Sequence, residues 1–131
     1  MTSERTLRDC HVLVVEDEWL VAEELHSELA EAGAVIIGPV AGLQDALEVI
    51  RQEARIDGAI LDINLQGELV FPVADLLIER GVPFVFTTGY DKSVIPTRFE
   101  RVVRCEKPTP LPIVVGAIGR LMHSSGLPAL G

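Results

Sequence analysis

The chain has 131 residues, 48% of them hydrophobic, which suits one domain with a core of its own and argues against disorder. Its formal net charge of -9 argues against a nucleic-acid backbone as a partner and permits a bound cation. No apolar run approaches the roughly 20 residues of a membrane span, and residues 1–9 are polar, so we expect a cytoplasmic protein without a membrane partner.

Five short apolar runs alternate with stretches of helical spacing along the chain. The runs predict strands at residues 11–15, 34–38, 58–62, 83–88 and 101–105. The first is rich in β-branched residues, which is typical of a strand buried on both faces. The intervening patterns predict helices at 21–32, 43–55, 70–80, 91–100 and 113–121. The fourth of these is expected to be short or broken, because Pro96 removes a backbone donor.

This alternation predicts an α/β fold. Helical crossovers of this length imply parallel strands with right-handed connections, so helices cover both faces of one sheet. We expect a doubly wound, flavodoxin-like (βα)5 domain with a five-stranded parallel sheet in the order 2-1-3-4-5. The domain is predicted over residues 10–123, with a flexible tail at 1–9 and a second tail at 124–131.

Polar side chains stand where four of these strands end. Glu16 and Asp17 follow the first strand, Asp62 ends the third, Thr88 ends the fourth and Lys107 follows the fifth. Parallel strands bring these ends to one edge of the sheet, so the side chains are expected in one pocket. Carboxylates gathered in this way repel one another and need protons, the lysine or a cation. Oxygen ligands with open water positions favour Mg²⁺.

Such a pocket suits phosphoryl chemistry. A metal and Lys107 could neutralise phosphoryl oxygens, the Thr88 hydroxyl could bond another, and Asp62 could attack phosphorus as the nucleophile. Each residue alone has an ordinary explanation, such as a helix cap for Asp17 or a solvated lysine for Lys107. Their coincidence at four strand ends favours a functional site.

At these residues the chain resembles the response-regulator receiver domain of the CheY-like superfamily, over roughly residues 10–123. The resemblance rests on four motifs: Val-Val-Glu-Asp-Glu at 14–18, Leu-Asp-Ile-Asn-Leu at 61–65, Pro-Phe-Val-Phe-Thr-Thr-Gly-Tyr-Asp at 83–91 and Glu-Lys-Pro at 106–108. The third is similar to the variant subfamily with a Phe-Ala-Thr-Gly-x-Tyr motif, whose members are often single receiver domains.

The resemblance implies that Asp62 is the phosphoacceptor. It also implies that Asp17, with Glu16 beside it, binds Mg²⁺ directly or through water, and that the backbone carbonyl of Asn64 supplies another ligand. Asn64 and Tyr90 would flank the path of water to the phosphoryl group and tune its lifetime.

Further roles follow from the same resemblance. Thr88 and Lys107 would contact the phosphoryl group, Gly89 would keep access to it open, and the bond from Lys107 to Pro108 would be cis.

One position departs from the family pattern. Most receivers carry Tyr or Phe three residues before the lysine as a rotating switch, and Arg104 stands there in this chain. We hypothesise that the switch is rebuilt around Tyr90 and the weak helix that contains Pro96.

The resemblance implies a stand-alone receiver of a two-component system or phosphorelay, a phosphoacceptor and not an enzyme in the ordinary sense. It would take its phosphoryl group from a sensor histidine kinase or a histidine phosphotransfer protein, and promote its own phosphorylation and dephosphorylation. It would then signal to an unknown downstream protein by conformational change, or act as a phosphate sink. A homodimer is a further expectation, because receivers often pair through the fourth helix, fifth strand and fifth helix.

Two alternatives are a pseudo-receiver that only docks partners and a flavodoxin-like cofactor binder. The acidic run at residues 16–18 argues against the second, because a phosphate cradle needs a Ser-, Thr- or Gly-rich loop.

Overall fold

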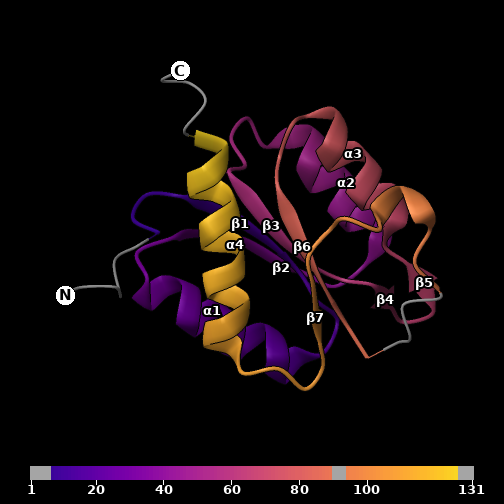
Figure 1. Ribbon diagram of the computed structural model, residues 1–131, viewed down its shortest axis with the longest axis horizontal. Helices are drawn as coiled ribbons and strands as arrows, with labels where there is room; N and C mark the ends of the chain where they lie inside the picture. Colours follow the sequence, from indigo (N-terminus) through magenta and orange to yellow (C-terminus); the bar gives the residue numbers. More distant parts are fainter. Residues whose placement is uncertain (1–6, 90–93, 127–131) are drawn as a thin grey trace.

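A parallel sheet of five strands crosses the centre of the molecule in the computed structural model, which describes residues 7–89 and 94–126 (Figure 1). The strands lie in the order β2-β1-β3-β6-β7, which confirms the predicted order 2-1-3-4-5. Their bounds are β1 His11–Val15, β2 Val35–Val40, β3 Gly58–Asp62, β6 Phe84–Thr88 and β7 Arg104–Glu106. The central strands β1, β3 and β6 are almost entirely buried, as their uninterrupted apolar runs predict.

Helices cover both faces of this sheet, as expected for a doubly wound fold. Figure 1 shows α1 (Trp19–Glu31) and α4 (Leu111–Gly126) on one face, and α2 (Leu43–Gln52) and α3 (Phe71–Glu79) on the other. Two hydrophobic clusters match these two layers, because alternate residues of each strand point to opposite faces. Within residues 7–89 and 94–126, each helix is too short or too polar to span a membrane.

The predicted fourth helix is reduced to one turn of 3₁₀-helix, η3 (Thr97–Phe99), within the described part of the chain. Pro96 stands immediately before this turn, which agrees with the expected break. The turn is held by Phe99, whose ring stacks on Phe71 at 5.4 Å and meets Phe86 edge-on at 5.7 Å. Residues 90–93 of the predicted helix lie outside the described residues.

A small hairpin follows β3, in a stretch for which the sequence predicts neither a strand nor a helix. Its strands are β4 (Asn64–Leu65) and β5 (Glu68–Leu69), which pair antiparallel. The two turn residues, Gln66 and Gly67, have φ of 55° and 94°, the signs that a type I′ turn requires. The Asn64 side chain accepts a hydrogen bond of 2.8 Å from the Gly67 N–H, which fixes the turn beside Asp62.

Both predicted domain boundaries need correction. Leu7, placed in the flexible tail at 1–9, is 1% exposed in the cluster beneath α1 and α4, and its N–H donates to the Ala32 carbonyl at 2.9 Å. The last helix continues to Gly126, beyond the predicted limit at residue 123. One buried leucine and one extra helical turn therefore extend the folded unit at its two ends.

Candidate functional site

The carboxyl ends of β1, β3, β6 and β7 meet at one edge of the sheet. Asp62 is the last residue of β3 and pairs in register with Thr87 of β6. Glu16 follows β1, and its N–H donates to the Val40 carbonyl at 3.0 Å. Lys107 follows β7, and its N–H donates to the Thr88 carbonyl at 2.8 Å. The backbone therefore delivers residues from four strands to a single place.

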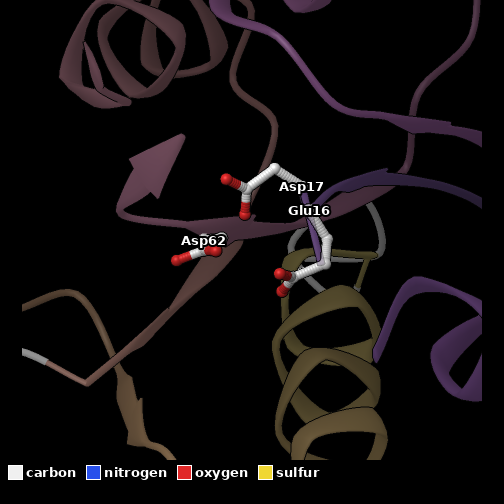
Figure 2. Close-up of side chains that lie close together, drawn as sticks. All are labelled: Glu16, Asp17 and Asp62. Atoms are coloured by element: carbon white, nitrogen blue, oxygen red, sulfur yellow. The ribbon is translucent and has the colours of Figure 1, made fainter. Parts of the chain in front are cut away.

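Three carboxylates converge there. Figure 2 shows Glu16 and Asp17, which follow β1, close to Asp62 at the end of β3. One oxygen from each lies within 4.8 Å of the others. Glu16 and Asp62 are 2% and 5% exposed, whereas Asp17 is half-buried. The Asn64 N–H donates to Oδ1 of Asp62 at 3.3 Å, so the hairpin helps to orient this carboxylate.

Lys107 is the cation of the site. Its Nζ atom lies 3.3 Å from Oε2 of Glu16, 3.0 Å from Oε1 of Glu18 and 3.3 Å from Oδ2 of Asp62. Burial lowers the pKa of Lys107, but the hydrogen bond that Lys107 donates to Glu18 and the charges of Asp62 and Glu16 raise it more, so its pKa lies above the ordinary value. The ammonium is therefore charged at neutral pH.

The fold changes the acidity of Asp62 strongly. Burial and the charge of Glu16 raise the pKa of Asp62 to about 7, although Lys107 lowers it. One ammonium does not offset all the carboxylates around it, so a proton or a second cation is needed to balance them. Perturbation by burial together with specific charged neighbours is typical of functional sites.

The donor atoms fit a magnesium ion. All the side-chain donors in the cluster are carboxylate oxygens, which Mg²⁺ prefers. In the described part of the chain, Oε1 of Glu16 is buried and has no hydrogen-bond partner. A buried carboxylate oxygen without a partner costs free energy that a bound cation would recover.

Comparisons with known proteins bear on the fold and the family of the chain. No protein-family model matches the chain. The receiver domain of the PhyR response regulator from Erythrobacter litoralis is 26% identical, with a TM-score of 0.78 over 89% of this chain and 92% of that one. SdrG from Sphingomonas melonis Fr1 is 32% identical, with a TM-score of 0.75 over 94% of this chain and 99% of that one.

The sensory transduction protein LytT of Bacillus cereus is 40% identical over 84 residues, which are 62% of this chain and 34% of LytT. This chain belongs to the response-regulator receiver family. The matched part covers about a third of the length of the curated relatives.

Thr88, Gly89 and Pro108 stand at or just after the carboxyl ends of β6 and β7. Thr88 ends β6 and is 1% exposed. Gly89 follows it at the surface, and an added Cβ there would meet no atom within 4 Å. The bond between Lys107 and Pro108 is cis, as the resemblance implied. Tyr90 lies outside the described residues.

Arg104, at the place of the usual aromatic switch, begins β7 and pairs in register with Phe86. Its side chain is half-buried, and within the described residues its Nε atom is buried without a hydrogen-bond partner. A flat, charged group therefore replaces a rotating aromatic ring at this position of the receiver.

Sequence reasoning missed one residue of the site, Glu18. It is the third acid of the run at residues 16–18, which was the available signal. The ion pair between Glu18 and Lys107 could not be predicted from the sequence, because the two residues are 89 positions apart and the position of Glu18 depends on where α1 begins.

Proposed function

We propose that this receiver accepts a phosphoryl group on Asp62 from a phosphohistidine of a sensor kinase or a phosphotransfer protein. The observation that carries the proposal is the position of Asp62: its carboxylate is buried among Glu16, Asp17 and Lys107 at the carboxyl edge of the sheet. Membership of the receiver family supports a role in two-component or phosphorelay signalling.

Asp62 acts as the nucleophile. One oxygen of its carboxylate attacks phosphorus in line, an O–P bond forms and the N–P bond to the donor imidazole breaks. The imidazole leaves with the electron pair of that bond and takes a proton from solvent. Because only the ionised carboxylate attacks, the pKa of about 7 makes charge balance around Asp62 decisive.

The neighbouring residues stabilise the transferring group. Lys107 donates to a phosphoryl oxygen and the Thr88 hydroxyl donates to another. The negative charge of the phosphoryl oxygens is therefore stabilised by donors that the fold has already positioned. Glu16, Asp17, Asp62 and the backbone carbonyl of Asn64 would hold Mg²⁺. When bound, this ion supplies positive charge that offsets the carboxylates and the phosphoryl oxygens.

The acyl phosphate on Asp62 favours one of two conformations that differ near Thr88 and the segment after it. Hydrolysis by water, tuned by the side chains at Asn64 and Tyr90, resets the domain. The protein promotes both steps on itself, and the signal leaves through contact with a downstream protein or by removal of phosphate from another receiver.

Incubation with Mg²⁺ and phosphoramidate tests the proposal, because the N–P bond of this donor models phosphohistidine. Intact-mass measurement should show one added phosphoryl group on the wild type and none on Asp62→Ala. Asp45→Ala is the matched control, since Asp45 is an exposed acid on α2 that should leave the adduct unchanged. A wild type without a Mg²⁺-dependent adduct would leave the docking module as the better explanation.

A further inference from the structure

All three N–H donors of the Lys107 ammonium already make hydrogen bonds in this structure. A lysine ammonium carries three N–H donors, and Nζ of Lys107 donates to three carboxylates, those of Glu16, Glu18 and Asp62. A phosphoryl oxygen on Asp62 can gain a direct hydrogen bond from Lys107 only if one of these contacts is given up.

Burial identifies the contact that is given up. The Glu16 side chain is 1% exposed, so water cannot take the place of Lys107 there. The Asp62 side chain is 7% exposed and is itself the group that receives the phosphoryl. The Glu18 side chain is 60% exposed, so water can replace Lys107 there at little cost.

The backbone around Glu18 holds its carboxylate ready for this contact. Glu18 occupies the N-cap position of α1, yet its side chain makes no capping hydrogen bond. Its N–H donates to Oε2 of Glu16 at 3.1 Å and its carbonyl accepts from the Ala22 N–H at 2.9 Å. The main chain is therefore fixed at both groups, while the carboxylate extends to Lys107 and not to the first turn of its helix.

We propose that Glu18 is a positioning residue that holds one donor of the Lys107 ammonium in the resting receiver and is displaced by the incoming phosphoryl group. The inference rests on the proposed function, because it concerns phosphoryl transfer to Asp62. It adds an internal competitor for Lys107, so the resting ion pair slows acceptance of the phosphoryl group.

Glu18→Gln tests this competition, because the amide keeps the size of the side chain and removes its charge. Glu24→Gln is the matched control: Glu24 lines the same cavity of about 500 Å³ between α1 and α4, and among the described residues no hydrogen bond or ion pair joins it to Lys107. With Mg²⁺ and acetyl phosphate, the Asp62 adduct should form about two- to fivefold faster in Glu18→Gln than in Glu24→Gln, the range expected for a partly exposed ion pair.

Two further readouts separate competition from a structural effect. Added salt screens the exposed Glu18 contact more than the buried ones, so the rates of wild type and Glu18→Gln should converge as ionic strength rises. The Nζ resonance of Lys107 should shift in Glu18→Gln and not in Glu24→Gln, and Glu18→Asp should restore part of the wild-type rate.

The outcomes distinguish the two proposals. A wild type that gains no adduct overturns the proposed function itself. A wild type that is phosphorylated, with Glu18→Gln as fast as or slower than Glu24→Gln, overturns the inference about Glu18 and leaves the proposed function intact. Thermal unfolding of each variant by circular dichroism verifies that the compared proteins are folded.

Discussion

The Nζ atom of Lys107 lies 3.3 Å from Oδ2 of Asp62, although the two residues are 45 positions apart in the sequence. They meet because β3 and β7 run parallel and end at the same edge of the sheet, with β6 between them. This ion pair is part of a cluster in which acids outnumber the base, and five predictions follow from it and from the packing around it.

Lys107→Met should raise the pKa of Asp62 further above about 7, because the charge and hydrogen bond of Lys107 act to lower it. Titration of the Asp62 carboxyl carbon by NMR, in buffer without divalent ions, measures the shift. Arg51→Met, at an exposed position of α2, is the control and should leave the pKa unchanged. An Asp62 pKa that stays the same or falls in Lys107→Met would contradict the proposed electrostatics.

Stability without metal should depend on pH through Asp62. Its pKa is raised from 3.8 to about 7, so between these values the native state binds more protons than the unfolded state. The free energy of unfolding of the wild type should therefore fall as pH rises through this window, by up to about 1.4 kcal/mol per pH unit relative to Asp62→Asn. Above the window the difference between the two proteins should level off.

Urea unfolding of both proteins at several pH values in EDTA measures this difference. Asp45→Asn, which changes an exposed carboxylate, provides the comparison. A difference between wild type and Asp62→Asn that did not change with pH would refute the assignment.

Magnesium should stabilise the folded protein, because the carboxylate cluster exists only in the native state. At a concentration a hundredfold above the dissociation constant, the gain in the free energy of unfolding is about 2.7 kcal/mol. Asp17→Asn should lose most of this gain and Asp45→Asn should keep it. Thermal unfolding with and without Mg²⁺ makes the measurement, and fluorescence of Trp19 offers a second probe, since Trp19 lines a cavity with Glu16 and Asp17.

Phe99→Ala should destabilise the fold by about 3–5 kcal/mol, the usual cost of removing a buried phenylalanine. Phe99 is 1% exposed and packs on Phe71 and Phe86, so its loss frees η3 from the core. Ile113→Ala, at a side chain that is 55% exposed, should change stability by no more than about 0.5 kcal/mol. If urea unfolding showed the same loss of stability for both variants, η3 would not be anchored through Phe99.

Beryllofluoride, a mimic of the phosphoryl group, should move the amide signals of Thr88, Gly89 and residues 94–104 in NMR spectra. The reason is that Thr88 ends β6 beside Asp62, and one turn of 3₁₀-helix, η3, stands among the described residues where a full helix would hold the segment more firmly. Arg80, whose guanidinium holds carbonyls of Ile50 and Ala54, is the internal control. Unmoved signals over residues 88–100 would refute a switch built in this segment.

The parts of the fold that could be predicted are those with strong local patterns and general topological rules. The β-branched run in β1 indicates a buried strand, and the right-handed crossover rule leaves few possible strand orders. The candidate site followed because parallel strands end at one edge, so Asp62 and Lys107 could be placed together without knowing any side-chain conformation.

Other features lack such signals. Leu7 is one apolar residue in a charged segment, so no periodicity marks it. Its burial in the core and the packing of Ala32 and Gly33 against residues 7–9 are visible only in the structure. The β4–β5 hairpin has two-residue strands, and Gln66 is an uncommon residue at a turn position with positive φ. The resemblance to the variant subfamily and the roles of Gly89, Tyr90 and Arg104 stay predictions.

The crowding of Glu16, Asp17, Glu18 and Asp62 around one ammonium also affects how partners approach. A phosphorylated donor carries negative charge, and the field of this edge of the sheet slows its diffusion towards Asp62 before any bond is made. That field extends about 8 Å at physiological ionic strength, far enough to act on the encounter itself. Under the proposed function, a divalent cation held by these carboxylates would weaken the repulsion, so its supply would set how often a donor reaches the pocket, in addition to how fast the phosphoryl group moves once it is there.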